Sequence, residues 1–318
     1  MKKSLGFGKS TTSSKAVALA IGFLIPYIYL YENVIKLMSD TKKIEQESLV
    51  DENLVARLEL QWDERRRERQ AAMSTSDRES FDIYEPEATC FDEERFGSEI
   101  RYHAYGDGPK FICGVDFIAK KAATAGGYHH GRNKNCLVYS VGSNNQIDFE
   151  KAAHKFLNGC EIHTFDPTLS KPFIGGEYAT FHPWGLGEDG VASRERGKTW
   201  VGKSFQTVMR ELGHTNRTID IIKIDCEGCE YQVMPPLFEL ISAGKAKVDQ
   251  ILIELHLRGK KGELLKEFFS GADKAKMRIF HKERNGWGCS GTKCAEYALA
   301  SETFLRKANS FAIHPSGS

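Results

Sequence analysis

Hydrophobic positions divide the chain into three stretches of different character. An apolar run covers residues 16–31, and a charged stretch without glycine or proline extends over residues 39–80. From Phe81 onward, short apolar runs alternate with segments whose apolar residues recur at helical spacing. This alternation is typical of a parallel sheet wrapped by helices. It predicts a doubly wound α/β domain with a mostly parallel sheet over residues 81–318.

The strongest elements of this domain can be placed from their patterns. Strands are expected at residues 136–141, 161–165, 219–224, 250–257 and 277–282, where apolar and β-branched residues run together. Helices are expected at residues 149–157, 205–212 and 262–269. Ser204 can cap the second helix and Gly213 can end it.

The apolar run at residues 16–31 follows a tail, residues 1–15, that contains lysines and no acid. A membrane-spanning helix needs about 20 apolar residues, so the run is slightly short. Tyrosines near its end and the basic tail nevertheless fit a transmembrane signal anchor with a cytoplasmic N-terminus and a luminal domain. A cleaved signal or transit peptide is the main alternative, and it would make the domain secreted.

Residues 32–80 are expected to form a charged, solvated helical stem. Val50, Leu54 and Leu58 give only a partial apolar stripe, which could pair two stems in a short coiled coil and so form a homodimer. Arg65 and its neighbouring arginines alternate with acids, so an exposed helix end is favoured over a nucleic-acid-binding patch.

Composition narrows the classes of function. The formal net charge of +1 provides no field that would attract nucleic acid, and no nucleic-acid partner is expected. Eight cysteines are compatible with two or three disulfides in an oxidising compartment, and Cys289 and Cys294 could close a small ring. The chain lacks the three-glycine dinucleotide fingerprint and the P-loop motif, which argues against nicotinamide and nucleoside triphosphate ligands.

Candidate chemistry follows the ends of the predicted strands, where open α/β sheets bind ligands. Gly142, with Ser143 and Asn144, follows the first strand, and a glycine there lets the backbone approach a ligand. Asp166 follows the second strand, about 24 residues later, which suits an acid that binds ribose hydroxyls. A plain turn glycine and a turn aspartate before Pro167 are the alternatives.

Three further positions are candidates. Trp184 could cover an adenine ring or simply pack in a turn. Asp225 and Glu227 follow the strand at residues 219–224, where they could face a substrate or a cation, or form a solvated pair at a helix N-terminus.

His256 shares a strand face with Glu254 and is either a general base or a hydrogen-bonded structural histidine. Cys226 and Cys229 have the spacing of half a zinc site or a redox pair. No second such pair exists at ribbon spacing, so Cys226 is expected to point into the sheet.

The segments CLVYSVGSNNQIDFEKA, GCEIHTFDPT, FHPWGLG, TIDIIKIDCEGCEYQVM and QILIELHL together resemble the FkbM-type methyltransferases, and more closely the membrane-anchored methyltransferase-like protein 24 group. The resemblance covers residues 95–257, and IDIIKIDCEGCE is its most specific segment. It implies a class I, Rossmann-like methyltransferase fold that binds S-adenosylmethionine.

The resemblance also implies roles for these residues. The Gly142–Asn144 segment would line the methionine part of the cofactor, Asp166 would bind the ribose, Trp184 would lie near the adenine, and Asp225 would close the pocket near the reacting methyl group. One departure is that Ser140 stands where many methyltransferases carry an acid at the start of the glycine motif.

A hydroxyl acceptor needs a base, and Glu227 and His256 are the expected catalytic residues. No metal site is assigned. The expected substrate is a glycan or small hydroxylated acceptor in the Golgi or another secretory membrane. The alternative is a membrane-anchored, non-catalytic binding or scaffold protein with the same fold.

Overall fold

The computed structural model describes residues 12–75, 81–97, 109–123, 128–129, 132–195, 197–257, 262–285, 289 and 293–314. The chain divides into two compact units, Met1–Leu54 and Val55–Ser318. Helix α1 (Thr12–Thr75) supplies all of the described part of the first unit and the beginning of the second.

In the first unit, side chains are described for residues 29–41, which are all exposed, and for Asn53, which is exposed, and Leu54, which is half-buried. Within the described part of the chain, no helix is both long enough and apolar enough to cross a membrane. Residues 1–11 and the side chains of residues 12–28 lie outside the described residues. These positions include most of the basic tail and of the expected anchor, so the anchor stays a prediction.

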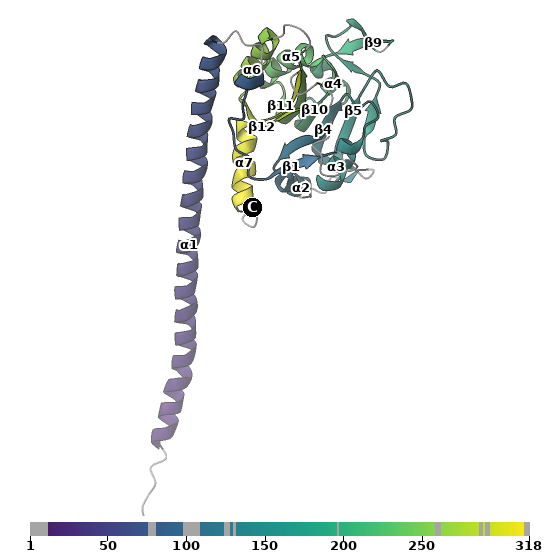
Figure 1. Ribbon diagram of the computed structural model, residues 1–318. Helices are drawn as coiled ribbons and strands as arrows, with labels where there is room; N and C mark the ends of the chain where they lie inside the picture. Colours follow the sequence, from purple (N-terminus) through teal and green to yellow (C-terminus); the bar gives the residue numbers. More distant parts are fainter. Residues whose placement is uncertain are drawn as a thin grey trace, which may run out of the picture. The chain divides into compact units, whose positions relative to one another are not determined.

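The second unit is built around a sheet with the strand order β12-β13-β11-β10-β4-β5-β6, and β3 pairs with β4 beside this path (Figure 1). Strands β4, β5, β6, β10 and β11 pair in parallel, whereas β13 is antiparallel to both β11 and β12. The strands are β3 (Tyr128–His129), β4 (Arg132–Val141), β5 (Cys160–Phe165), β6 (Thr180–His182), β10 (Thr218–Ile224), β11 (Lys247–His256), β12 (Met277–Arg284) and β13 (Cys294–Ser301).

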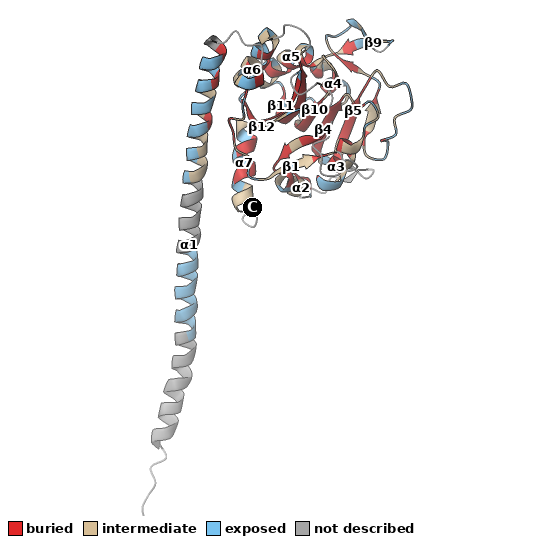
Figure 2. Cartoon of the chain, in the orientation of Figure 1, coloured by how far each residue is buried: buried red, intermediate tan, exposed pale blue. Residues whose placement is uncertain are grey.

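Helices cover both faces of this sheet, which confirms the predicted doubly wound, mostly parallel architecture. One hydrophobic cluster joins the sheet to α4, α5 and α6, and another joins its opposite face to α2, α3 and α7. Ile222 belongs to the first cluster and Ile221 to the second, because successive side chains of a strand point to opposite faces. The helices are α2 (Val115–Ala123), α3 (Asp148–Phe156), α4 (Phe205–Glu211), α5 (Glu230–Ser242), α6 (Gly262–Lys274) and α7 (Glu302–Ile313). Buried residues concentrate in the strands between these layers (Figure 2).

Three smaller features complete the unit. Strands β1 (Glu93–Phe96) and β2 (Lys110–Cys113) form an antiparallel pair. Strands β7 (Gly185–Leu186), β8 (Ala192–Glu195) and β9 (Lys198–Lys203) form a three-stranded sheet between β6 and α4. A short 3-10 helix, η1, covers Phe81–Ile83. The sequence pattern predicted none of these.

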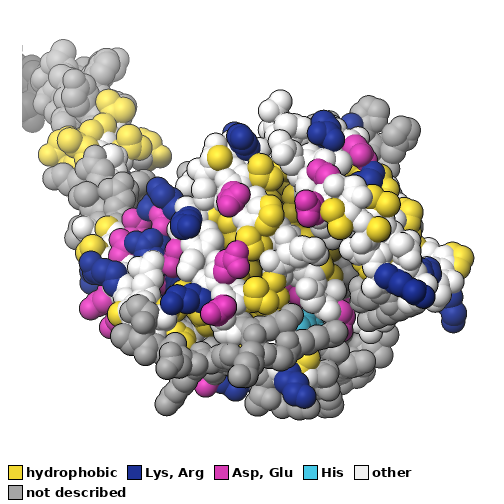
Figure 3. Space-filling model, turned by 90° about the horizontal axis from the view of Figure 1, so that it is seen from above, with side chains coloured by type: hydrophobic (Ala, Val, Ile, Leu, Met, Phe, Trp, Pro, Cys, Tyr) yellow, Lys and Arg dark blue, Asp and Glu magenta, His cyan; other side chains and the backbone are white. Residues whose placement is uncertain are grey.

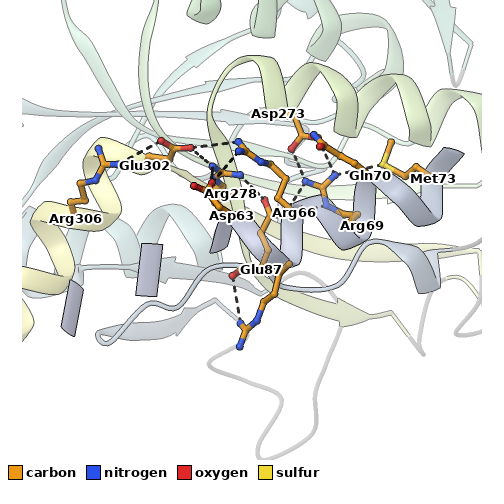
Figure 4. Close-up of polar contacts among 11 residues, drawn as sticks. Asp63, Arg66, Arg69, Gln70, Met73, Glu87, Asp273, Arg278, Glu302 and Arg306 are labelled. Atoms are coloured by element: carbon orange, nitrogen blue, oxygen red, sulfur yellow. Dashed lines mark hydrogen bonds and ion pairs between the residues drawn. The ribbon is translucent and has the colours of Figure 1, made fainter. Parts of the chain in front are cut away.

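The end of α1 corrects the predicted domain boundary. The globular unit starts at Val55, not at Phe81, because the last turns of α1 pack on it. Trp62 is 2% exposed, and the buried guanidinium of Arg69 pairs with Glu87 at 2.9 Å and with Asp273 at 2.6 Å (Figure 4). Trp62 and Arg69 are isolated buried positions within a charged segment, so the pattern suggested a fully solvated stem.

All eight cysteines form disulfides, more than the two or three expected. The bonds are Cys90–Cys113, Cys136–Cys160, Cys226–Cys229 and Cys289–Cys294. The predicted small ring between Cys289 and Cys294 is confirmed. Cys226, which was expected to point into the sheet, packs against the first hydrophobic cluster and is also bonded to Cys229.

Candidate active site

A pocket lies at the carboxyl ends of the central strands, beside the point where strand order reverses between β4 and β10. This is where open α/β sheets bind ligands. Seen from above, over the end of the molecule that carries α5, α6 and β9, hydrophobic side chains gather in the middle of the face with acidic side chains beside them (Figure 3). Of the residues predicted from sequence, the pocket is lined by Gly142, Ser143, Asn144, Asp166, Trp184, Asp225 and Glu227. His256 is not part of the lining.

Gly142 joins the ends of three strands. Its N–H donates to the carbonyl of Phe165 at the end of β5, and the N–H of Asp225 donates to Val141 at the end of β4, both at 2.9 Å. Gly142 has a φ of +76°, and a Cβ on this residue would lie 1.8 Å from the carbonyl oxygen of Asp225. Only glycine allows the Asp225 backbone to approach so closely at this point of the pocket wall.

Asp166 is hydrogen-bonded to the loop that follows Gly142. Its Oδ2 accepts hydrogen bonds from the N–H groups of Ser143 and Asn144, at 3.0 and 2.8 Å. Its Oδ1 accepts from the N–H and hydroxyl of Thr168, at 2.8 and 2.7 Å. Burial raises the pKa of Asp166, but the hydrogen bonds from Thr168, Asn144 and Ser143 outweigh burial and lower it. The carboxylate is thus ionised and held rigidly in the pocket.

Ser140 stands where many methyltransferases carry an acid, and in this chain it contacts an acid from a helix. The hydroxyl of Ser140 donates to Oε1 of Glu150 on α3 at 2.7 Å, and the hydroxyl of Thr164 donates to the same atom at 3.3 Å. Glu150 is 1% exposed. A carboxylate therefore lies beneath the glycine turn after all. Glu150 lies in a helix ten residues after Ser140, so the sequence around the glycine motif did not predict it.

An aromatic wall closes the side of the pocket next to β6. Trp184 and Trp200 both line the pocket, and the ammonium of Lys203 lies 3.8 Å from the ring centre of Trp184. A Cβ at Gly185 would lie 1.7 Å from Nε1 of Trp200, so the glycine makes room for the indole. Sequence reasoning found Trp184 but missed Trp200, which the three-stranded insert brings back to the pocket.

A buried acid–base cluster lies on the opposite side. Lys110 on β2 is 3.6 Å from Asp225 and 2.6 Å from Glu296 on β13. Burial and then the Asp225 charge raise the pKa of Glu254, a pocket residue, to about 7. Burial likewise raises the pKa of Glu296 to about 8. The ammonium groups of Lys110 and Lys223 outweigh the effect of burial on Asp225 and lower its pKa.

His256 does not fit its predicted role as a base. Its Nδ1 lies 2.8 Å from Oε1 of Glu230, a residue with no exposed surface. Burial lowers the pKa of His256, but the hydrogen bond and charge of Glu230 outweigh burial and raise it to about 9. A pKa of about 9 favours the protonated imidazole at neutral pH, which makes His256 a poor general base in this environment.

Glu227 lies on the short turn between β10 and α5. The Cys226–Cys229 disulfide closes this turn, both cysteines line the pocket, and Glu227 has a φ of +58°. The Glu227 side chain is 40% exposed, and its Oε2 lies 3.8 Å from Nε2 of His256. The disulfide therefore holds Glu227 at the edge of the pocket in a backbone conformation that residues other than glycine rarely adopt.

Known proteins include relatives of this chain. Residues 52–300 match a family described as a methyltransferase domain. The probable methyltransferase-like protein 24 of Homo sapiens is 27% identical over 159 residues, which is 48% of this chain, and its Rattus norvegicus counterpart is 24% identical over the same length. The matched region spans 40% of each relative's own length.

Solved structures with a similar chain path include a Methanococcus jannaschii fibrillarin pre-rRNA processing protein, at 10% identity and a TM-score of 0.33. It covers 65% of this chain and 88% of its own. An O-methyltransferase from Bacillus cereus in complex with SAH has 10% identity and a TM-score of 0.35 and covers 59% of this chain and 90% of its own. Because the family match extends over residues 52–300, most of the 318-residue sequence, the chain belongs to the methyltransferase domain family.

Proposed function

We propose that this protein is an S-adenosylmethionine-dependent O-methyltransferase that acts on a glycan or a small hydroxylated acceptor. The observation that carries the proposal is the convergence, in one pocket of a methyltransferase domain, of the Gly142 turn, Asp166, Trp184 and Asp225. These residues come from four different strand ends, and only the fold brings them together.

The pocket offers a chemical partner for each part of the cofactor. The indoles of Trp184 and Trp200 provide apolar surface for an adenine ring. Asp225 is ionised and suits the positive charge of the sulfonium or the amino group. Asp166 suits ribose hydroxyls, although a carboxylate offers about four acceptor positions and protein donors use all of them. A ribose hydroxyl would therefore replace the hydroxyl of Thr168.

The bound cofactor supplies an activated methyl group on a positively charged sulfur. The protein aligns the acceptor oxygen with that methyl carbon, so that an O–C bond forms as the S–C bond breaks and the sulfur leaves as a neutral thioether. The acceptor hydroxyl must lose its proton to a base. Glu254 suits this step better than His256, because it lines the pocket and its pKa of about 7 lies near working pH, and Glu227 at the pocket edge is the second candidate.

Calorimetry with S-adenosylmethionine, followed by an acceptor screen with labelled cofactor, tests this function. We expect cofactor binding that Asp166→Ala weakens, and transfer of label to a hydroxyl of at least one acceptor class. Absence of binding at millimolar cofactor would exclude the enzyme.

The second candidate is a non-catalytic binding protein with a methyltransferase fold. The observation that favours it is the complete use of the Asp166 carboxylate by protein groups. This candidate predicts that wild-type protein releases no S-adenosylhomocysteine with any acceptor, even if cofactor binds.

We further propose that the chain is a single-pass type II membrane protein of the Golgi or another secretory membrane, with its methyltransferase domain in the lumen. The basic tail, the apolar run at residues 16–31 and the pairing of all eight cysteines support this location. Carbonate extraction and protease protection of microsomes test it. Light scattering of the full chain tests whether two stems pair.

A further inference from the structure

One group of side chains at the pocket combines two carboxylates with a buried imidazole. Asp225, Glu227 and His256 each offer a ligand atom, and these atoms all lie within 4.8 Å of one another. Glu254 adjoins them, with its Oε2 3.7 Å from Nε2 of His256. We propose that Asp225, Glu227 and His256 bind one divalent transition-metal ion, and that Glu254 lies next to this ion without being one of its ligands.

The position of His256 favours an ion at this site. The imidazole is 4% exposed, and its Nδ1 is fixed at 2.8 Å by Glu230. Its Nε2 faces the Glu227 and Glu254 carboxylates at 3.8 and 3.7 Å, which is too far for a hydrogen bond. A tetrahedral ion with bonds of about 2.1 Å would hold its ligand atoms roughly 3.4 Å apart. Small side-chain movements would therefore accommodate an ion, which would displace the proton from Nε2 of His256 as it binds.

The surrounding groups hold these ligands in the way that metal sites require. A histidine ligand characteristically donates its other N–H to a carboxylate, and Glu230 accepts here from His256. Asn285 donates to Oε1 of Glu254 at 2.8 Å, and the Glu254 carboxyl is also hydrogen-bonded to the ligand Asp225. Both supporting residues are buried, so the arrangement is built into the fold.

The donor atoms of the site decide which ions it suits. Asp225 and Glu227 offer carboxylate oxygens and His256 offers an imidazole nitrogen. The ammonium groups of Lys110 and Lys223 act on Asp225 alone among these ligands, and Lys110 lies closer to Glu296, at 2.6 Å, than to Asp225, at 3.6 Å. Mixed oxygen and nitrogen donors suit Mn²⁺ or Zn²⁺.

The ion would also define the acceptor, and this part rests on the proposed methyl transfer. A hydroxyl bound to a divalent ion loses its proton more easily, so the oxygen becomes a better nucleophile for the methyl carbon. Its proton passes to Glu254 in the pocket wall. Acceptors with two neighbouring oxygens, such as a vicinal diol of a sugar, could occupy two positions on the ion and so be selected.

The chain contains a rival cluster that provides a matched control. Glu161, His163 and His214 also bring ligand atoms within 4.8 Å of one another. There, however, the guanidinium of Arg217 binds Oε2 of Glu161 and already balances its charge. We therefore expect that cluster to remain without an ion.

Metal binding by the full chain, measured by equilibrium dialysis with Mn²⁺ or Zn²⁺ and elemental analysis, tests the proposal without cofactor or acceptor. We expect one ion per chain. Glu227→Gln and His256→Asn should each weaken binding at least tenfold, and Glu230→Gln by about 10–100-fold. Glu161→Gln should leave binding unchanged. Absence of binding, binding that survives Glu227→Gln, or binding lost in Glu161→Gln would overturn the proposal.

Two further measurements make the result decisive. Glu227 is partly exposed, so its variant is expected to fold even if the His256 variant does not. In the wild-type chain, electron paramagnetic resonance of bound Mn²⁺ should show coupling to a histidine nitrogen, and its absence would contradict the assigned ligands. Cofactor binding is measured separately by calorimetry. A chain that binds cofactor but no metal contradicts only this inference, whereas one that binds metal but no cofactor contradicts the proposed enzyme.

Discussion

Glu254 shows how burial and one neighbouring charge set the chemistry of a single carboxyl group. These effects raise its pKa to about 7, so its ionisation changes with pH near neutrality. We expect Glu254→Gln to lower kcat by about 10²–10⁴-fold, the usual contribution of a general base. In the wild type, kcat should rise with pH through about 7, because only the ionised form accepts a proton. Steady-state pH profiles check this, and a flat profile would assign the proton to another group.

Gly142 allows a direct test of the tight backbone contact in the pocket wall. The strained φ alone should make Gly142→Ala destabilise the fold by about 1–3 kcal/mol. The total loss should exceed this range, because the added Cβ would clash with the Asp225 carbonyl. Gly190→Ala is the matched control, since Gly190 has a φ of +80° and open space around it. Urea unfolding measures both. Equal losses at the two sites would show that the contact with Asp225 has no effect.

At the scale of single residues, sequence reasoning found the groups that follow strands and missed those that reach the pocket from elsewhere. Asp166 and Asp225 were predictable because strand ends converge at one edge of the sheet. Glu150 and Lys110 were not, since each enters from a different element. The protonated state of His256 depends on Glu230, whose side chain only the fold brings against it.

The last turns of α1 form an element whose packing rests on a few side chains. Arg69→Met would remove the hydrogen-bonded partner of buried Glu87 and leave it only the Arg278 guanidinium at 3.9 Å, which should cost up to about 3–5 kcal/mol. Arg67→Met, at an exposed position of the same helix, should change stability by less than about 0.5 kcal/mol. Chemical unfolding of the two variants compares them. A small effect for Arg69→Met would mean that the helix end contributes little to the fold.

The elements that the sequence predicted well are those with strong patterns. The predicted strand at residues 219–224 matches β10, and Ser204 caps α4 by accepting from the N–H of Thr207. The insert β7–β9–β8 was missed because its strands are short and, outside β7, only partly buried, so they lack a clear apolar alternation. The position of β13 between β11 and β12 is a matter of topology, which a local pattern does not encode.

For the molecule as a whole, the structure predicts where the chain can be shortened. A fragment of residues 55–318 retains the packing of Trp62 and Arg69 and should unfold cooperatively. A fragment of residues 81–318 loses those contacts and should be less stable or aggregate, because it exposes the apolar surface that Trp62 covers. Circular dichroism and size-exclusion chromatography distinguish them. Equal stability of the two fragments would restore the boundary at Phe81.

The disulfides have a consequence for how the chain is made. Eight cysteines allow 105 pairings, yet each bond joins one cysteine to the next along the sequence, at separations of 23, 24, 3 and 5 residues. A chain synthesised from its N-terminus presents the two members of every pair in succession. Oxidation in order of emergence would therefore produce the native set directly, without a stage in which wrongly paired cysteines are exchanged.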